Sequence, residues 1–478
     1  MSSITKHAQL ACLTFLVFVA AFVCGTGCVR APSDRTEDGR ILVEYWEKWT
    51  GFEGDAMQAV VDDFNRSQDR IFVRKLTVSN IDHKMMLATA GGNPPDLAGL
   101  WSHNIPVYAE KGALTPLNRL LEEAGITRDD YIPVFWDLCQ LRGFMWALPS
   151  TPASVALHWN KKMFRDAGLD PERPPRTIEE LDRMGEQITL VEVKRNGKKE
   201  RIRFTELTDE ERASHSFDII TLGYTPSEPG WWNAVWGYWF GGRLWDEDRK
   251  ITANSPENIE AFTWFQGYTK KYGLNNLRKF GAAFGNFASP QNPFLAGQVA
   301  MVMQGVWMYN FIDKYAPELE WAVAPFPSRD PEKWPNVTMV ECDVLVIPRG
   351  SRHEREAFEF IKYVNTQPAM EKLNLGQRKF SALATTSDDF IRSHPNRYIE
   401  TFLALARSPN AIPVPRISVY NEYVDEMSVA ADRIFNLLAT PEVALGDVQA
   451  RMQWKFDRVL RRWDLIKDDR LKEWSAEQ

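Results

Sequence analysis

The chain has 478 residues, of which 44% are hydrophobic and 25% are charged, a balance typical of a globular protein with about three domains or two large lobes. Its formal net charge of −7 lacks the basic excess of proteins that hold phosphate backbones, so we expect no nucleic-acid partner. The five cysteines form no CxxC pair, the seven histidines are scattered, and the common phosphate-binding and hydrolase motifs are absent. We therefore expect neither a metal site nor a cofactor.

The N-terminal residues have the pattern of an export signal. An apolar run from Leu10 to Cys24 is short for a membrane span and matches the apolar core of a secretory signal. Small residues then precede Cys28, which resembles a bacterial lipobox, although Gly25 stands where that motif usually has leucine. The pattern predicts a signal peptide over residues 1–27, a lipidated Cys28 and a polar tether over 28–40. Modification at Cys24, an ordinary signal peptide and an uncleaved anchor are the alternatives.

The segment after the tether alternates between strand and helix patterns. Short apolar runs predict strands at Ile41–Tyr45, Ile71–Val78 and Asp96–Leu100. Apolar residues at helical spacing predict a helix that opens at Gly51–Asp55, and a second helix is predicted at His83–Ala90. This order predicts an α/β fold with a mostly parallel sheet.

Later segments are mainly helical. An Asn-Gly turn signal between alternating apolar residues predicts a basic surface hairpin over residues 191–204. Amphipathic patterns predict helices at Ile259–Tyr272 and Ser428–Leu438, and the chain beyond Asp447 is also predicted to be helical. Trp474, near the end of that last segment, is expected on the surface.

Six short stretches between residues 41 and 364 match a set of family motifs in order and spacing. They are the strand at Ile41–Tyr45 with its helix, GGNPPDL at Gly91–Leu97, LPSTPASVALHWNKKMFRDAGL at Leu148–Leu169 with PPRTIEEL after it, GGRLWD at Gly241–Asp246, FLAGQVAMVMQGVW at Phe294–Trp307, and VLVIPRG leading into a helix at Val344–Val364. Together they resemble the extracellular solute-binding proteins of ABC importers, the family that includes maltose-binding protein. The chain departs from the family pattern at Glu341 and Cys342, where the family often has a Gly-Gly pair.

The resemblance implies a two-lobe fold of the type II periplasmic-binding-protein kind, with the ligand in the cleft between the lobes and three hinge crossings. The implied crossings are Pro152–Ser154, Val340–Asp343 and Ala382–Thr386. The implied division is 41–152 and 343–384 for lobe I, and 153–342 and 385–478 for lobe II. Lobe closure about such hinges is a common response to ligand.

A sugar has apolar C–H faces and a rim of hydroxyl groups, so its site needs aromatic rings beside carboxylates, amides or guanidinium groups. The chain has such residues where predicted strands and loops end, and Trp307 matches a pocket aromatic of the family. The predicted ligand-binding residues are Trp46, Glu47, Trp49, Thr50, Glu53, Trp101, Ser102, His103, Asn104, Trp231, Trp232, Trp307, Glu341, Arg378, Tyr420 and Asn421.

For the other aromatic, acidic and cysteine residues, a structural role is favoured over a role in ligand binding. Trp236, Trp239 and Trp245 are expected in the core, and the paired acids on predicted helices are expected on solvated faces. Cys139 and Cys342 are expected to be buried free thiols, with a disulfide between them as the alternative.

The leading interpretation is a monomeric, lipid-anchored extracytoplasmic receptor that delivers a sugar or polyol to the permease subunits of an ABC transporter, and that is not an enzyme. One alternative is a secreted glycoside-active enzyme, which needs two carboxylates facing one bond. Another is a ligand-binding partner of a membrane sensor, which would share the fold. The acidic pocket would suit a polyol, an oligosaccharide or a cationic solute.

Overall fold

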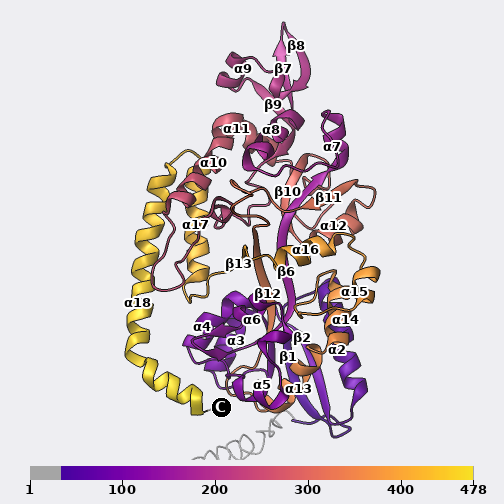
Figure 1. Ribbon diagram of the computed structural model, residues 1–478, viewed down its shortest axis with the longest axis vertical. Coiled ribbons are helices and arrows are strands. Elements are labelled where there is room, and N and C mark those ends of the chain that lie inside the picture. Colours follow the sequence, from indigo (N-terminus) through magenta and orange to yellow (C-terminus); the bar gives the residue numbers. More distant parts are fainter. Residues whose placement is uncertain (1–33, 477–478) are drawn as a thin grey trace, which may run out of the picture.

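A mixed β-sheet organises the protein, whose computed structural model describes residues 34–476 (Figure 1). The strands follow the order β2-β1-β3-β12-β6-β10-β9-β7-β8, with β11 beside β6 and β13 beside β12. The predicted signal peptide and Cys28 lie outside the described residues. The strands of this sheet are β1 (Ile41–Glu47), β2 (Ile71–Thr77), β3 (Leu97–Trp101), β6 (Leu148–Asn160), β7 (Leu190–Arg195), β8 (Lys198–Arg203), β9 (Phe217–Tyr224), β10 (Val299–Gly305), β11 (Trp321–Ala324), β12 (Thr338–Val346) and β13 (Ala411–Pro413), and β4 (Gln140–Leu141) pairs separately with β5 (Phe144–Met145).

The expected α/β class is confirmed, but the expectation of a mostly parallel sheet is wrong beyond the first strands. Strand β1 pairs in parallel with β2 and β3, as a β-α-β-α-β order requires. In contrast, β12 pairs antiparallel with β3 and β6, and β6 pairs antiparallel with β10 and β11. The chain passes between the two ends of the molecule several times, so strands that meet at its middle run in opposite directions.

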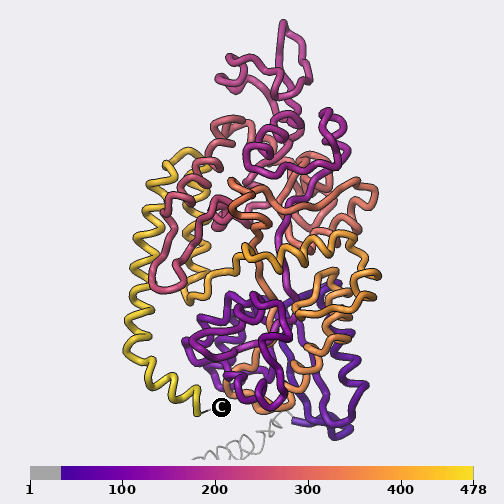
Figure 2. The backbone as a smooth tube through the Cα atoms, viewed as in Figure 1, coloured from indigo at the N-terminus to yellow at the C-terminus, as the bar shows by residue number. Residues whose placement is uncertain are grey.

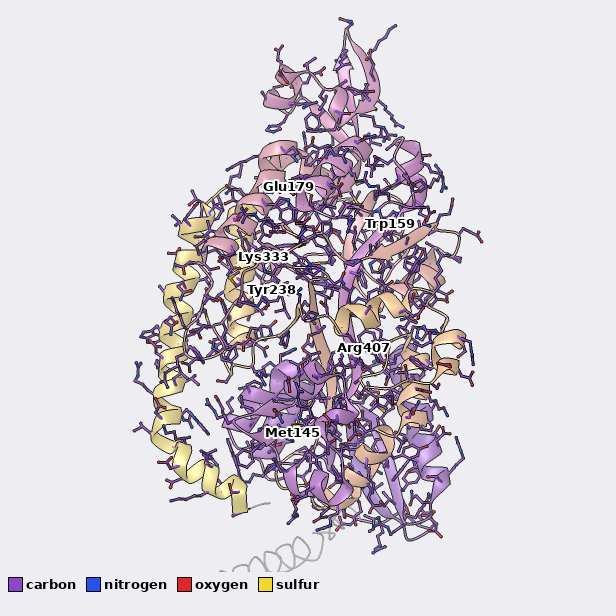
Figure 3. All side chains as sticks on the ribbon, in the orientation of Figure 1. Met145, Trp159, Glu179, Tyr238, Lys333 and Arg407 are labelled. Atoms are coloured by element: carbon purple, nitrogen blue, oxygen red, sulfur yellow. The ribbon has the colours of Figure 1, made fainter. Side chains whose placement is uncertain are left out.

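Strand β6 joins the two bodies of the molecule, a lower body around β1–β3 and an upper body around β7–β11 (Figure 2). Met145, just before β6, lies low in Figure 3, whereas Trp159 near its end lies in the upper body. Two of the predicted crossings lie side by side, because Val340 of β12 pairs with Ser154 of β6. That these crossings act as hinges, and the division into lobes, remain predictions.

Helices cover both bodies. They are α2 (Gly51–Ser67), α3 (Ile81–Ala90), α4 (Ile105–Glu110), α5 (Asn118–Ala124), α6 (Pro133–Leu138), α7 (Lys161–Asp166), α8 (Ile178–Ile188), α9 (Asp209–Ser214), α10 (Pro256–Tyr272), α11 (Leu274–Gly281), α12 (Met308–Tyr315), α13 (Glu354–Val364), α14 (Gln367–Gln377), α15 (Asp388–Ser393), α16 (Ile399–Ala406), α17 (Tyr420–Phe435) and α18 (Pro441–Ala476). Short 3-10 turns include η1 (Ser102–Asn104). None of the helices in residues 34–476 is long and apolar enough to cross a membrane.

Local sequence signals explain several of these boundaries. The predicted first helix is confirmed as α2, which buries Met57, Val60, Val61 and Phe64 on one face. Helix α17 begins at Tyr420, earlier than the predicted helix at Ser428–Leu438, because Tyr420 and Tyr423 extend its buried face toward the N-terminus. The predicted hairpin is confirmed as β7–β8, where Asn196 and Gly197 both have positive φ angles that suit a tight hairpin turn.

The long helix α18 packs against both bodies. Its N-terminal part contacts α10 and α17 in the upper body, and its far end reaches the lower body, as the yellow helix in Figure 1 shows. There the Trp474 ring is fully buried, with its centroid 4.7 Å from that of Trp146 and 5.6 Å from that of Trp463. The Arg349 guanidinium lies 2.6 Å from the Glu473 carboxylate. The expectation that Trp474 is a surface residue is therefore wrong, because its partners come from distant segments.

Replacing Trp474 by alanine is predicted to destabilise the protein by about 3–5 kcal/mol, since it removes a fully buried ring and leaves a cavity. Urea unfolding followed by circular dichroism measures this change. Trp454 lies on the same helix with 57% of its surface exposed, so Trp454→Ala serves as the matched control and should change stability by less than about 0.5 kcal/mol. Equal stability of the two variants would show that the far end of α18 is not anchored.

Candidate functional site

A cavity of about 600 Å³ lies where β6 and β12 join the two bodies. Nine aromatic side chains line it, and they come from segments far apart in the sequence: Trp49, Phe52, Trp101, Trp231, Trp232, Phe287, Trp307, Phe311 and Tyr420. Its polar lining is small and mostly charged: Glu53, His103, Thr151, Glu341, Asp343, Lys379, Asn421 and Asp425. Such a volume suits an organic ligand of several rings.

The upper wall of the cavity is a cluster of aromatic rings that pack against one another. The Trp307 ring folds back over Gly305, where a Cβ atom would lie 2.3 Å from the ring, so glycine is needed for this approach. The Trp232 indole donates a 2.8 Å hydrogen bond to the Met303 carbonyl of β10 and is buried. Trp231 is 49% exposed and packs with its ring centroid 4.5 Å from that of Phe287. Trp232 thus supports the wall, while Trp231 and Trp307 offer ring surface to a ligand.

On the lower wall, hydrogen bonding and charge fix the position of Trp49. Its indole Nε1 donates a 2.9 Å hydrogen bond to Asp343 Oδ2, and its ring meets that of Trp101 edge to face at 6.0 Å. The Nζ atoms of Lys48 and Lys379 lie 5.2 and 5.3 Å from the Trp49 ring centroid. Both ammonium groups are close enough for cation–π attraction.

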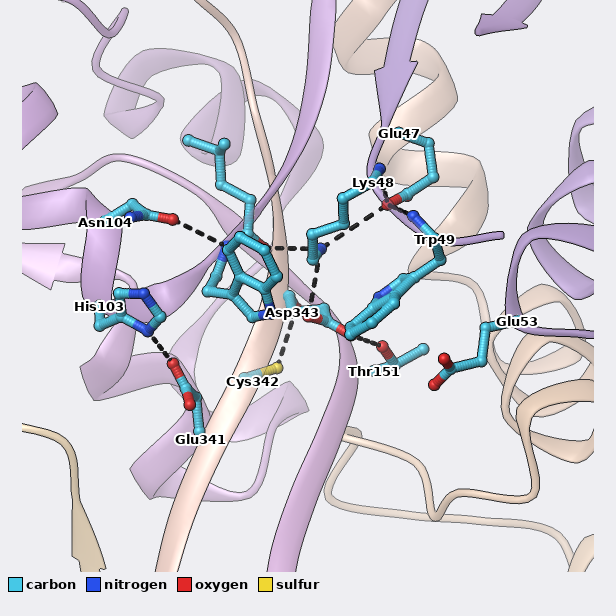
Figure 4. A network of polar contacts seen from close by, with 12 residues as sticks. Glu47, Lys48, Trp49, Glu53, His103, Asn104, Thr151, Glu341, Cys342 and Asp343 are labelled. Atoms are coloured by element: carbon cyan, nitrogen blue, oxygen red, sulfur yellow. Dashed lines mark hydrogen bonds and ion pairs between the residues drawn. The ribbon is translucent and has the colours of Figure 1, made fainter. Parts of the chain in front are cut away.

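Asp343 is the centre of a buried ion cluster (Figure 4). Lys48 Nζ lies 3.1 Å and Lys379 Nζ lies 3.5 Å from its carboxylate, and the Thr151 hydroxyl donates a 2.6 Å hydrogen bond to it. Burial alone would raise the pKa of Asp343, but the two ammonium groups and the donated hydrogen bonds outweigh burial and hold that pKa below its usual value. Asp343 is therefore ionised at neutral pH.

Lys379 links this cluster to Glu53 at the start of α2, with 3.0 Å between Nζ and Oε1. Burial would lower the pKa of Lys379, but the carboxylates of Glu53 and Asp343 outweigh it and raise the pKa. The ammonium group is thus charged and already has two anionic partners.

His103 and Glu341 form a second polar pair on the cavity wall. His103 Nδ1 contacts the Glu341 carboxylate, and the imidazole ring stacks on Trp101 with a centroid distance of 5.8 Å. The same imidazole lies 5.8 Å from the Tyr420 ring on α17. Because an imidazole is cationic only when protonated, this contact cancels the Glu341 charge only in that state.

The structure brings ten of the sixteen predicted site residues to the cavity wall, and the other six do not line it. On the wall are Trp49, Glu53, Trp101, His103, Trp231, Trp232, Trp307, Glu341, Tyr420 and Asn421. The six that do not line it are Trp46, Glu47, Thr50, Ser102, Asn104 and Arg378. The roles of all sixteen residues in ligand binding remain predictions.

Several of these six side chains form hydrogen bonds that fix nearby backbone segments. The buried Glu47 carboxylate accepts hydrogen bonds from the Tyr45 hydroxyl and from backbone amides, and it fills the space beside Gly99. Asn104 accepts a 3.3 Å hydrogen bond from the Trp101 amide. Arg378 has a left-handed backbone at the end of α14 and donates to the Leu375 carbonyl at 2.7 Å.

Sequence reasoning missed Phe52, Phe287, Phe311, Lys379 and Asp425 as wall residues. Phe311 follows Trp307 by one helical turn, so the helical spacing after the family motif carried a usable signal. Phe287 lies in an irregular segment between α11 and β10 and carries no comparable pattern.

Other expectations concern the core. Trp236 and Trp239 are fully buried, as predicted, whereas Trp245 is only partly buried and donates to the Asp248 carbonyl. The predicted buried free thiols are confirmed at Cys139 and Cys342, and burial raises the pKa of both. Within residues 34–476, no group of three or more His, Cys, Asp or Glu side chains is arranged to hold a metal ion.

Comparisons with known proteins give a consistent result. A family model described as bacterial extracellular solute-binding protein matches residues 59–388. The maltotriose-binding protein of Pyrococcus abyssi (strain GE5 / Orsay) is 21% identical over 351 residues, which are 72% of this chain and 67% of that protein. The sn-glycerol-3-phosphate-binding periplasmic protein UgpB of Yersinia pestis is 24% identical over 146 residues, 29% of this chain and 33% of that protein.

Solved structures share the fold. CpMnBP1 with mannotriose bound is 26% identical, with a TM-score of 0.71 and coverage of 86% of this chain and 99% of that chain. The sugar-binding protein MalE from Xanthomonas citri is 18% identical, with a TM-score of 0.69 and coverage of 89% and 99%. These likenesses confirm the expected type II fold.

Replacing Lys379 by methionine is predicted to lower the free energy of unfolding by about 3 kcal/mol, because it leaves the buried charge of Asp343 with fewer partners. Lys372→Met is the matched control, since it breaks an exposed ion pair with Asp63 and should cost less than about 1 kcal/mol. Urea unfolding at neutral pH compares the two variants. A Lys379 variant as stable as the control would mean that the cluster does not hold the lower wall.

Proposed function

The chain belongs to the bacterial extracellular solute-binding proteins, and on that premise we propose that it is the carbohydrate receptor of an ABC importer. The observation that carries the proposal is a cavity lined by aromatic rings from both bodies of the molecule. Indole faces attract the apolar C–H faces of sugar rings, and carboxylates at the rim accept hydrogen bonds from hydroxyl groups. The maltotriose-binding relative and the mannotriose complex support this ligand class.

The charge of the cavity argues against a phosphorylated ligand of the kind named for the sn-glycerol-3-phosphate-binding relative. Among residues 34–476, Lys379 is the only lysine or arginine that lines the cavity, and Glu53 and Asp343 already engage its ammonium group. A phosphate would find no free cation there and would lie near carboxylates. An oligosaccharide without anionic groups is therefore favoured.

The alternative of a glycoside-active enzyme requires two carboxylates that flank one glycosidic bond, one as acid and one as base or nucleophile. Two of the four carboxylates on the wall, those of Glu53 and Asp343, are bound to Lys379. The family membership also favours binding without chemistry. Recovery of an unaltered sugar after long incubation would support the receptor, and release of shortened sugar would support the enzyme.

The remaining parts of the proposal concern the place of the protein in the cell. We infer that Cys28 carries a lipid anchor, that residues 28–40 tether the folded part to the membrane, and that the protein is a monomer. The lobes would pivot at the three crossings when sugar binds, and the closed form would deliver sugar to permease subunits. A role as the ligand-binding partner of a membrane sensor would use the same cavity and differ only in the docking partner.

Trp307→Ala is predicted to weaken sugar binding by about tenfold or more, because base stacking on aromatic rings, the nearest measured analogue, contributes about 1–3 kcal/mol. Isothermal titration with maltotriose and mannotriose measures the change in Kd. Trp454→Ala, an exposed tryptophan on α18, is the control and should bind like the unmodified protein. Unchanged affinity in the Trp307 variant would show that the Trp307 ring of the upper wall does not contribute to sugar binding.

Cys28→Ala is predicted to abolish lipid labelling and to leave the precursor uncut at that position. Metabolic labelling with a fatty-acid analogue followed by mass spectrometry of the N-terminus detects both effects. Cys24→Ala is the matched control and should leave labelling intact. If labelling persists in the Cys28 variant, the lipid is attached to another residue, and Cys24 is the first candidate.

A further inference from the structure

We propose that the ligand of this cavity carries positive charge, and that its chemical class is an amino-sugar oligosaccharide. The inference rests on the proposed function, because it names the kind of sugar that the same site takes. It follows from the charge balance of the wall and from the partners that each carboxylate has.

The wall has more negative than positive charge. Four carboxylates line the cavity, those of Glu53, Glu341, Asp343 and Asp425, against the single ammonium group of Lys379. Lys48 adds a second cation behind the wall, but it also contacts the Glu47 carboxylate at 3.7 Å. The two lysines thus already face the three carboxylates of Asp343, Glu53 and Glu47, and they leave no positive charge for Glu341 and Asp425.

Glu341 and Asp425 are the two wall carboxylates that no described lysine or arginine contacts. Glu341, on β12, contacts only the imidazole of His103 among the described side chains, and that ring is neutral unless protonated. Asp425, on α17, is exposed, and its carboxylate makes no hydrogen bond or ion pair with another described side chain or backbone group in residues 34–476. Two negative charges therefore face the cavity from neighbouring elements.

Ligand binding makes these charges costly unless a cation comes with the ligand. Lobe closure would replace water around both carboxylates with protein and sugar, and a buried carboxylate without a cationic partner is strongly disfavoured. Sugar hydroxyls donate hydrogen bonds but do not cancel charge. A protonated amine on the sugar does both, so the closed complex gains most from an amino sugar.

The aromatic walls also favour a cation. Ring faces attract ammonium groups, and the protein already uses this attraction, since Lys48 Nζ lies 5.1 Å from the Trp101 ring centroid as well as near Trp49. Trp231 and Trp307 have no such protein cation among the described side chains. Their faces are free to stack sugar rings and to lie beside an ammonium group on the ligand.

The test compares three trisaccharides of equal length by isothermal titration: one of glucosamine, one of N-acetylglucosamine and one of glucose. The titrations are run at about pH 7, which is above the ordinary pKa of an imidazole and below that of an α-amine. We expect the glucosamine trisaccharide to bind at least about tenfold more tightly than the two uncharged ones. Added salt should reduce this advantage, because screening weakens attraction between ligand and wall charges.

The variant Asp425→Asn should reduce the glucosamine-to-glucose affinity ratio by about threefold or more. The control is Asp469→Asn, which changes another exposed aspartate on a helix, away from the cavity, and should leave the ratio unchanged. Equal or tighter binding of an uncharged trisaccharide overturns this inference and leaves the proposed function standing. Failure of all three sugars and of maltotriose and mannotriose to bind overturns the proposed function itself.

Discussion

The buried carboxylate of Asp343 holds together the parts of the chain that make the cavity. It lies on β12, at the middle of the sheet, and it binds Lys48 after β1 and Lys379 after α14. It also accepts hydrogen bonds from Trp49 and from Thr151 on β6. A buried ion needs all of its partners at once, so its geometry fixes where these four segments meet. The position of the lower aromatic wall follows from that meeting point.

The two walls of the cavity differ in what fixes their aromatic rings. The upper wall, built on β10 and the loops beside it, offers aromatic faces whose positions depend on packing, as the ring of Trp307 over Gly305 shows. The lower wall places rings beside fixed charges. Apolar faces give affinity for sugar rings without regard to their substituents, whereas charges distinguish between neutral, anionic and cationic forms. Under the proposed function, discrimination between neutral and charged sugars would fall to the carboxylates of Glu341 and Asp425 rather than to the tryptophans.

Local patterns in the sequence were sufficient for elements that depend on near neighbours in the chain. The helix that buries Met57 and Phe64 and the hairpin at Asn196 and Gly197 were predictable from local patterns. The position of Trp307 on the cavity wall was predictable from the family resemblance. Long-range contacts were not predictable in this way. Lys379 forms ion pairs with Glu53 and Asp343, which are distant in the sequence. Trp474 is buried against Trp146, which is also distant in the sequence. Only the folded chain brings these residues together.

Helix α18 gives the molecule a second mechanical link in parallel with strands β6 and β12. Because its two ends pack against different bodies, a rotation between the bodies would have to change the contacts at one end of α18 or bend the helix. The buried Trp474 ring and the Arg349–Glu473 ion pair lie at the end in the lower body. Some of the contacts that would resist a rotation of one body against the other therefore lie at the far end of α18, which is remote from the cavity. A sequence change there would alter the contacts between α18 and the lower body and would leave every residue of the cavity wall unchanged.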